Sequence, residues 1–438
     1  FGGRTVYGGG GIIPDYFIPR DTLGMTTYFR ELYSTTLPHD FTFNFVDKNR
    51  DLLQSQETLT DLVEEVRKLR PMNQLIRYAE KHGVKRRNLM IRKSYTIIER
   101  YQLIQIIDQV LGTRYAVQFE NQTDPAVLKA VELINAGYDV VVADNLSNSD
   151  MSGVEGVRKI TGVDVPFVNV DCCDKEAFRK LFEQYNFNSV IHFAAYKAVG
   201  ESVSDPMKYY RNNLDSFLTI LELMKEFGRK NVLFSSSATV YGDADTLPVT
   251  ELTPRKPATS PYGNTKQMSE DILRDMVAAH EGLHGIVLRY FNPIGAHPSA
   301  QIGELPRGVP NNLVPSITQT AAGIRESLSI FGDDYPTPDG SCLRDYIDIV
   351  DLARAHVVAI DRMVNGKQKD RYEVFNIGTG RPVSVFELVR GFESANNLKL
   401  NYKVAPRRAG DVTAVWADTT LANEELGWHA ERELSDTL

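Results

Sequence analysis

Hydrophobic periodicity divides the chain into two parts with different patterns. Between residues 23 and 129 apolar positions recur every three or four residues, as at 59, 62, 63, 66 and 69 within 57–70. The stretch 94–112 repeats this spacing, which is typical of one apolar face of a helix. From residue 138 onward, helical patterns alternate with short apolar runs at 138–144, 165–170, 188–193, 231–236 and 285–291. That alternation predicts an α/β fold with a doubly wound parallel sheet.

Residues 1–22 fit neither pattern because they are rich in glycine and proline. The four consecutive glycines that end at Gly11 could suggest a phosphate loop. A phosphate loop leads directly into a helix, and Pro14 and Pro19 oppose a helix at this place. We therefore interpret the glycine run as a surface turn between short extended segments.

Composition excludes several classes of protein. The 438 residues are 42% hydrophobic and 24% charged with a net charge of −8, which argues against a nucleic-acid partner. No apolar run approaches ~18 residues, so we expect no membrane span. Cys172, Cys173 and Cys342 are too few for a disulfide framework and favour a reducing, cytoplasmic compartment. No cluster with metal-ligand spacing stands out, and we expect no metal.

A carboxylate follows the first predicted strand. In "VVVADN" the strand ends at Asp144, the place where a dinucleotide-binding fold holds the adenosine ribose. Such an acid lies ~20 residues after a glycine-rich turn. Here that place reads "ENQTDPA", and no glycine occurs between Thr113 and Ala136. The sequence thus offers the ribose ligand without the expected phosphate loop.

Two further polar groups follow later strands. "VIHFAAYKAVGES" carries His192 and Lys197, and "VLFSSSATVYGD" carries three serines that end at Ser237. Ligands of doubly wound folds bind at these strand ends. Taken singly, each group has a purely structural explanation: a turn acid, a buried strand histidine, a polar strand end.

The segment "SPYGNTK" makes the functional interpretation stronger. Ser260 can cap a helix, Pro261 suits its first turn, and Tyr262 and Lys266 then stand four residues apart on one face. An ammonium beside a phenol should lower the phenol pKa from its usual ~10 and make a general base. Ser237 precedes this helix and can hydrogen-bond the same substrate hydroxyl.

With these motifs in place, residues 130–438 resemble the UDP-glucose 4-epimerase family of extended short-chain dehydrogenases. The resemblance rests on "DNLSNS", "VIHFAAYKAVGES", "FSSSATVYGD", "SPYGNTK", "LRYFNPIGAHP", "GVPNNLVP", "IFGDDYPTPDGSCLRDYI" and "APRRAGDV". It implies a Rossmann-like sheet, bound NAD, a UDP-hexose substrate and epimerisation through a 4-keto intermediate, and it allows a homodimer. It starts inside the first helix of that fold, so the first strand and the glycine-rich loop are missing or substituted.

The resemblance also implies residue roles. Tyr262 would be the base, Lys266 would lower its pKa and hold the nicotinamide ribose, and Ser237 would support the sugar hydroxyl. The implied NAD contacts are Asp144, Asn145, Asp171, Cys172, Phe193, Ala194, Ala195, Lys197, Asn212, Tyr262, Lys266 and Tyr290. The implied UDP-sugar contacts are Ser237, Asn292, Asn312, Leu313, Phe331, Arg344, Arg408, Asp411 and Val415.

Side-chain chemistry agrees with some of these roles. The guanidinium groups of Arg344 and Arg408 suit a diphosphate, although surface ion pairs would explain them equally well. Asp144 accepts hydrogen bonds from a 2′-hydroxyl and repels a 2′-phosphate, which favours NAD over NADP. Val415 stands where the family places a sugar-pocket wall, and its small size predicts that N-acetylated UDP-hexoses also fit.

The domain division follows from pattern and resemblance together. We expect a glycine-rich β remnant at 1–22, a helical segment at 23–129, an NAD-binding domain at 130–293 and a UDP-sugar-binding domain at 294–438. Residues 1–129, through "GRTVYGGGGIIPD" and the helical tail, resemble the end of a carboxy-terminal processing peptidase of the Ser–Lys type. That likeness lies beyond the catalytic core of the peptidases, so it implies no peptidase activity.

Three alternatives remain open from the sequence. In the first, "RYAVQFENQTDPA" supplies a substitute first strand and the chain is a working epimerase. In the second, the chain is a non-catalytic fusion that retains at most UDP-sugar binding. The third is a sugar-nucleotide 4,6-dehydratase, which needs an acid and a base just after the serine, where this chain has Ala238 and Thr239. Because Glu120 and Asp124 replace glycines, we expect weak NAD binding and weak or no activity.

Overall fold

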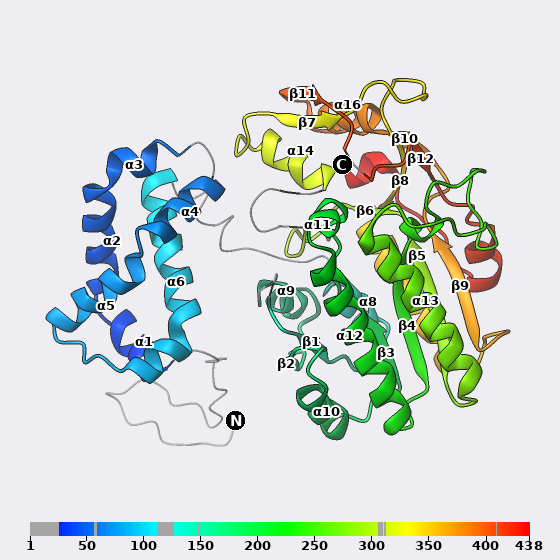
Figure 1. Cartoon of the computed structure of the whole chain (residues 1–438), viewed down its shortest axis with the longest axis horizontal. Helices are drawn as coiled ribbons and strands as arrows, with labels where there is room; N and C mark the ends of the chain where they lie inside the picture. Colours follow the sequence, from blue (N-terminus) through cyan, green and yellow to red (C-terminus); the bar gives the residue numbers. More distant parts are fainter. Residues whose placement is uncertain are drawn as a thin grey trace, which may run out of the picture. The chain divides into compact units, whose positions relative to one another are not determined.

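The computed structural model describes residues 26–56, 59–111, 127–147, 149, 151–304, 310, 312–408 and 410–438. The chain divides into two units, Phe1–Glu120 and Asn121–Leu438, which are described separately (Figure 1). The glycine-rich stretch 1–22, the candidate substitute strand 115–119 and the residues 120–126 ahead of the first helix of the second unit lie outside the described residues.

Helices form the described part of the first unit. They are α1 (Thr27–Tyr33), α2 (Leu37–Lys48), α3 (Arg50–Gln54), α4 (Leu59–Lys68), α5 (Pro71–Lys81) and α6 (Asn88–Leu111). The predicted helix at 57–70 is α4, whose Leu62 and Val66 are fully buried. The predicted helix at 94–112 is the greater part of α6, which begins earlier and contacts each of the other five helices.

The second unit begins as an alternation of helices and strands, as predicted. Its elements up to the fifth strand are α8 (Leu128–Asn135), β1 (Val142–Asp144), α9 (Ser152–Thr161), β2 (Phe167–Asn169), α10 (Lys175–Gln184), β3 (Ser189–His192), α11 (Val199–Ser204), α12 (Pro206–Glu226), β4 (Asn231–Ser237), α13 (Pro261–Ala279) and β5 (His284–Tyr290). Each predicted strand therefore exists at its expected place, and the helices between them make the strands parallel.

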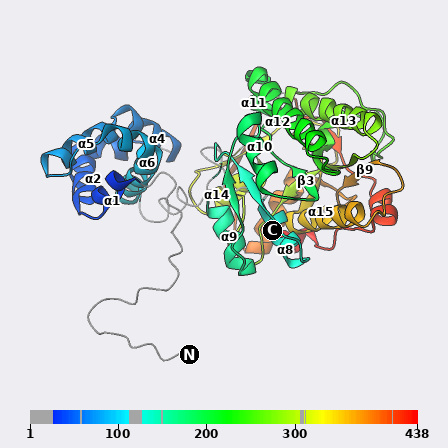
Figure 2. The same ribbon diagram turned by 90° about the horizontal axis from the view of Figure 1, so that it is seen from below.

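The main sheet has the order β3-β4-β5-β9, all parallel, where β9 is Tyr372–Ile377. Figure 2 shows α10, α12 and α13 over one face and α8 and α15 (Ile349–Val364) over the other. Alternate strand residues enter the two cores: Leu233 and Ile286 pack with α8 and α15, and Phe234 and Val287 with α12 and α13. This is a three-layer doubly wound fold.

Strands β1 and β2 form a separate parallel pair. Strand β1 covers only Val142–Asp144 of the predicted 138–144, because the described residues supply a partner on one side alone. The common dinucleotide-binding order 3-2-1-4-5-6 puts a strand between the positions held here by β1 and β3. The described part of the chain has no strand at that position.

The rest of the chain builds smaller sheets around β8. Its elements are β6 (Asn292–Ile294), α14 (Leu313–Ala321), β7 (Leu328–Phe331), β8 (Leu343–Asp348), β10 (Pro382–Ser384), α16 (Val385–Asn396), β11 (Tyr402–Ala405), β12 (Ala414–Val415) and α17 (Leu434–Thr437). Strand β8 pairs with β6, β10 and β12, and β7 pairs with β11. None of the helices in the described ranges is long and apolar enough to cross a membrane.

Candidate active site

Helix α13 begins as the sequence predicts. The Ser260 hydroxyl accepts a hydrogen bond from the Gly263 amide at 3.2 Å, and Pro261 is the first helical residue. This cap fixes the start of the helix and places Tyr262 in the first turn and Lys266 one turn later. Both therefore face the carboxyl end of β4, where Ser237 lies.

Lys266 is anchored by the backbone of β4. Its ammonium donates to the Ser235 carbonyl oxygen at 2.6 Å and lies 4.9 Å from the centroid of the Phe234 ring. Burial lowers the Lys266 pKa to about 8, and the nearby Glu270 carboxylate opposes that shift. The ammonium is 5.9 Å from the centroid of the Tyr262 ring, so it lies beside the phenol without a recorded hydrogen bond to it.

The expected lowering of the Tyr262 pKa is not found in this structure. Burial raises the Tyr262 pKa, because a phenolate loses hydration in this site. A hydrogen bond with Ser237 and the charge of Lys197 act in the opposite direction without reversing the shift. Ser237 and Tyr262 are thus in contact, and the role of Lys266 in lowering the Tyr262 pKa stays a prediction.

A buried polar network behind Lys266 was missed by the sequence analysis. Glu270, 1% exposed, accepts hydrogen bonds from the Ser236 hydroxyl at 2.6 Å and from Arg289 at 2.7 and 3.0 Å. Arg289 also donates to the Tyr241 hydroxyl at 2.9 Å. The network ties α13 to β4 and β5. The four-residue spacing from Lys266 to Glu270 was its one sequence signal.

The predicted ribose ligand lies at the end of β1. One Asp144 carboxylate oxygen accepts from the Leu146 amide at 2.6 Å and from the Ser149 hydroxyl at 2.9 Å. The Asn145 amide donates to Asp171 at 3.2 Å. The structure thus brings Asp144, Asn145 and Asp171 together at the carboxyl ends of β1 and β2, with the buried Cys172 next in the chain.

The residues after β3 form the opposite wall of the predicted NAD site. The Ala194 carbonyl accepts from the Ser216 hydroxyl at 3.2 Å, and Asn212 donates to Asn213 at 3.0 Å. His192 is 2% exposed, and its Nε2 atom lies 3.3 Å from the same Ser216 hydroxyl. This environment fits a buried strand histidine with a purely structural role.

Lys197 and Tyr290, two further predicted NAD contacts, each have a described partner. Lys197 lies 3.7 Å from Glu304, whose carboxylate also accepts from Asn312 at 2.6 Å. The Tyr290 hydroxyl hydrogen-bonds His356 Nε2 and also interacts with Ser235. Glu304 and His356 are further residues that strand-end reasoning missed, because their side chains reach these positions only through tertiary packing.

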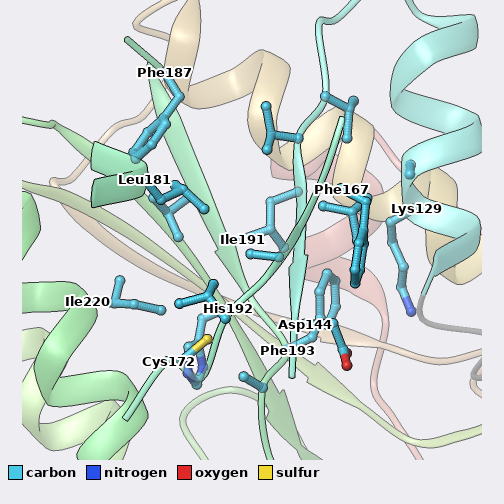
Figure 3. Close-up of a pocket in the computed structure, with 18 of the residues that line it drawn as sticks. Lys129, Asp144, Phe167, Cys172, Leu181, Phe187, Ile191, His192, Phe193 and Ile220 are labelled. Carbon is cyan, nitrogen blue, oxygen red and sulfur yellow. The ribbon is translucent and has the colours of Figure 1, made fainter. Parts of the chain in front are cut away.

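A cavity of about 770 Å³ lies between β1 and β3 (Figure 3). Eight of the predicted NAD residues line it: Asp144, Asn145, Asp171, Cys172, Phe193, Ala194, Ala195 and Asn212. The cavity also extends along the strands past Val190 and Ile191 to Phe187, far from the polar strand ends. It therefore contains a ligand cleft at one end and an apolar slot along the rest of its length.

The residues present fit part of a dinucleotide. Asp144 can accept from a ribose hydroxyl, and Lys266 lies beside Tyr262 where a second ribose would be held. No described residue provides a glycine-rich turn before α8. The first turn of α8 instead carries Lys129, 5% exposed, whose ammonium lies 4.7 Å from the centroid of the Phe193 ring. The ribose ends thus have ligands, whereas the backbone cradle for the diphosphate is absent from the described residues.

The predicted UDP-sugar residues also converge in part. Asp411 accepts a hydrogen bond from Arg408 at 2.9 Å and lies 3.8 Å from Arg344. The Arg408 guanidinium is 5.8 Å from the centroid of the Phe331 ring. Val415 of β12 stands opposite Arg344 of β8 in the parallel register. Two guanidinium groups held by one carboxylate form a basic pair that can accept a diphosphate.

The remaining substrate residues lie at element ends. Asn292 begins β6, and Asn312 and Leu313 begin α14. Val415 is 8% exposed and packs in one apolar cluster with Ala238 and Phe291, the neighbours of Ser237 and Asn292. Val415 is thus both a core residue and a neighbour of the residues predicted to contact the sugar.

Together, a doubly wound sheet and a Ser–Tyr–Lys group at its strand ends define an extended short-chain dehydrogenase. The family model "NAD dependent epimerase/dehydratase family" matches residues 129–378. A UDP-glucose 4-epimerase from Bacillus subtilis is 49% identical over 306 residues, which cover 70% of this chain and 89% of that protein. The chain belongs to the UDP-glucose 4-epimerases within this family.

Solved structures agree with this assignment. A UDP-glucose 4-epimerase from Bifidobacterium longum, in complex with NAD+ and UDP, matches with a TM-score of 0.69 and 44% identity, covering 72% of this chain and 93% of that one. A UDP-Glc/GlcNAc 4-epimerase from Campylobacter jejuni matches with a TM-score of 0.62 and 32% identity, covering 72% and 94%.

The first unit has a separate match. Residues 28–112 match a family of unknown function (DUF8443). The likeness of residues 1–129 to a processing-peptidase tail remains a prediction from the sequence, as do the domain boundaries at 22, 129 and 293. The boundary between the two units of the structure falls at Glu120.

Proposed function

We propose that the chain is a UDP-hexose 4-epimerase that interconverts UDP-glucose and UDP-galactose with NAD as a retained cofactor. The observation that carries the proposal is the arrangement of Ser237, Tyr262 and Lys266 at the end of β4, in a chain 49% identical to a UDP-glucose 4-epimerase. Bound NAD would accept the hydride from the sugar C4 and return it. We further propose a homodimer and a cytoplasmic location, on the resemblance and the cysteine content alone.

The chain's own groups have distinct parts in this reaction. The Tyr262 phenol oxygen takes the proton of the sugar 4-hydroxyl and later returns it, while Ser237 hydrogen-bonds the phenol and orients the hydroxyl. Lys266, fixed by the Ser235 carbonyl, supplies positive charge beside the phenol. Arg344 and Arg408 hold the diphosphate and leave the hexose free to present either face.

We also propose that the chain binds NAD weakly. Glycines normally let the backbone amides approach the cofactor diphosphate at the start of the first helix. The sequence ahead of α8 supplies Glu120 and Asp124, whose carboxylates repel a diphosphate, and Pro125, which lacks an amide hydrogen. The second candidate function, a fusion that binds UDP-sugars without turnover, would follow only if NAD binding fails altogether.

One experiment separates the two candidates. The purified chain is denatured to release nucleotide, and NAD is counted per protomer alongside the rate of UDP-galactose epimerisation. A chimera with an apolar strand and a G-x-x-G-x-x-G turn inserted before Ala130 is the control. We expect more than tenfold less NAD and activity in the unmodified chain. Close to one NAD per protomer and equal rates would refute weak binding, and an inactive chimera would refute the epimerase assignment.

A further inference from the structure

The two serines before Ser237 point to opposite faces of the main sheet. Successive side chains of a strand alternate in this way, and the Ser236 hydroxyl faces α13, where it donates to Glu270 at 2.6 Å. Ser235 therefore points to the face covered by α15 (Figure 2). There its hydroxyl hydrogen-bonds the phenol of Tyr290. This partner of Ser235 has no part in the proton transfer proposed above.

Tyr290 ends β5 directly beside β4. In the parallel register of the two strands, Tyr290 is the residue opposite Ser237. Its ring packs against the apolar core that α8 and α15 share, and its hydroxyl hydrogen-bonds Nε2 of His356 in α15. His356 is fully buried. A second phenol thus lies next to the Ser237–Tyr262 pair, with its hydroxyl joined to an imidazole inside the core.

Helix α15 fixes which ring nitrogen of His356 carries the proton. Nδ1 lies 2.7 Å from the carbonyl oxygen of Leu352, one turn earlier in the helix. A carbonyl oxygen only accepts, so Nδ1 donates. Burial lowers the His356 pKa well below its usual value, and the charge of Lys129 acts in the same direction, so the ring is neutral. A neutral imidazole with its proton on Nδ1 has a bare Nε2 that accepts.

The hydroxyl groups can then be ordered in one way only. Because Nε2 of His356 accepts, the Tyr290 phenol donates its proton to it. Because that proton is engaged, the Ser235 hydroxyl is the donor in its contact with the Tyr290 oxygen. Burial raises the Tyr290 pKa, so this phenol keeps its proton at neutral pH. Tyr290 is therefore anchored as a donor to α15, and Tyr262 is left to exchange a proton.

The same bonds hold the end of β4 in place. The Ser235 carbonyl accepts from Lys266 at 2.6 Å, while the Ser235 hydroxyl is tied through Tyr290 to His356. The strand end is thus fixed from the α13 face and from the α15 face. A shift of Ser235 would displace both the acceptor of Lys266 and Ser237 two residues later. A misplacement of ~1 Å can cost ~10²-fold in rate, so this second anchor matters for the reaction.

We propose that His356 is a positioning residue for the epimerisation and that it acts by accepting the Tyr290 hydroxyl. The bond keeps the phenol turned toward α15 and holds the end of β4 where proton transfer requires it. No described contact joins His356 to Tyr262 or Lys266, so its action passes through Tyr290 and Ser235. This inference rests on the proposed function, because it concerns the same reaction.

The test compares two amide variants of His356 that differ in reach. The amide of His356→Gln extends to the place of Nε2 and can accept from Tyr290, whereas that of His356→Asn extends only to the place of Nδ1. For UDP-galactose, kcat should fall by about tenfold or more in His356→Asn and stay within about threefold in His356→Gln. KM should change by less than about twofold in both, because the groups that hold the diphosphate are untouched. Equal kcat values in the two folded variants would overturn the proposal.

Tyr290→Phe tests the same bond from its other end. It removes the donor and retains the ring, so kcat should fall by about the same factor as in His356→Asn. The double variant should lose no more than either single variant, since one hydrogen bond can be lost only once. Losses that multiply would show that His356 acts independently of Tyr290. If His356→Asn does not fold, judged by circular dichroism, Tyr290→Phe decides, and near-normal kcat there would overturn the proposal.

A readout without turnover checks the direction of the bond. In NMR of the nitrogen-labelled full chain, the His356 signals are assigned by their loss in His356→Gln. They should show Nδ1 protonated and Nε2 bare at neutral pH, and a protonated Nε2 would overturn the proposal. Rates are measured in the unmodified chain or, where it is too slow, in the chimera described above. If neither protein epimerises UDP-galactose, the proposed function fails and this inference with it. If they do and His356→Gln loses as much as His356→Asn, only this inference fails.

Discussion

The two sides of the nucleotide-binding domain differ in how fully their strands are paired and buried among the described residues. We call the side of β4 and β5 the complete side and the side of β1 and β2 the incomplete side. On the side of β4 and β5, the five central residues of each strand are buried and both edges are paired. On the side of β1 and β2, β1 is only half-buried and one edge faces the slot. The groups predicted for proton transfer lie on the complete side, and the ligands predicted for adenosine lie on the incomplete side.

This difference shows that the two tasks of the fold, proton transfer and nucleotide binding, depend on contacts between different helices and strands. Lys266 is positioned by the Ser235 carbonyl and by Glu270, which belong to β4 and α13. None of these contacts requires a strand between β1 and β3. The proton-transfer groups can therefore be in place although no described residue supplies the diphosphate cradle, and the two can be tested independently.

The largest expected effect tests the complete side. Tyr262→Phe removes the phenol oxygen and retains the ring, so turnover of UDP-galactose should fall by ~10²-fold or more, the usual scale for a lost general base. Turnover is measured in the unmodified chain or, where that rate is too low, in the chimera with the restored strand. Near-normal turnover in either protein would show that another group takes the proton.

The next effect concerns the predicted substrate pocket, to which β12 contributes Val415. Strand β12 belongs to neither of the two sides compared above. Val415→Tyr enlarges a buried residue that packs with Ala238 and Phe291. We expect the use of UDP-N-acetylglucosamine to be abolished while UDP-glucose is spared, because a steric clash excludes a larger sugar more firmly than a lost contact weakens it. Rates for both sugars are compared in the same protein, and an equal loss of both would show that Val415 acts only as core.

A smaller effect concerns the network behind Lys266. Glu270→Gln removes the carboxylate that raises the Lys266 pKa, so the pKa should fall further below about 8. Activity that needs the ammonium is lost as the pH rises through this pKa. In the variant that loss should therefore begin at a lower pH than in the unmodified chain. At pH 8, kcat should fall about tenfold for each pH unit by which the Lys266 pKa drops, with little change in KM. The neighbouring, half-buried Asp271→Asn is the control, and an unchanged pH profile in Glu270→Gln would contradict the positioning role.

The last prediction concerns the stability of the incomplete side and leaves activity near neutral pH unchanged. Burial lowers the His192 pKa to about 3, so the unfolded chain, with its usual value of about 6.5, binds the proton more readily. The contribution of neutral His192 to the free energy of unfolding is fully present above pH 6.5. It should fall by up to about 1.4 kcal/mol per pH unit as the pH drops from 6.5 toward 3. His192→Gln should flatten this part of the curve in urea unfolding. Exposed His429→Gln should not, and equal slopes in all three proteins would refute the assignment.

Sequence periodicity predicted most of the second unit because the signals are local. Apolar runs marked the first five strands, β1 to β5, but not β6 to β12, and a serine followed by proline marked the start of α13. The four-residue spacing of Tyr262 and Lys266 and the missing glycines before Ala136 needed no structure to be recognised. Strand β1 came out shorter than predicted because a strand also requires a partner, which the apolar run at 138–144 could not reveal.

The sequence by itself determined where helices begin, which side chains share a helix face, and that the usual phosphate loop is missing, since these depend on neighbours a few residues apart. Only the tertiary structure decided that Lys266 binds a backbone carbonyl of β4, that burial raises the Tyr262 pKa, and that Glu270 links two strands to α13. It also decided that, among the described residues, β1 pairs only with β2 and β3 only with β4, and that a cavity is lined by both β1 and β3. Burial and pairing between distant segments depend on how the layers pack, and no local pattern specifies them.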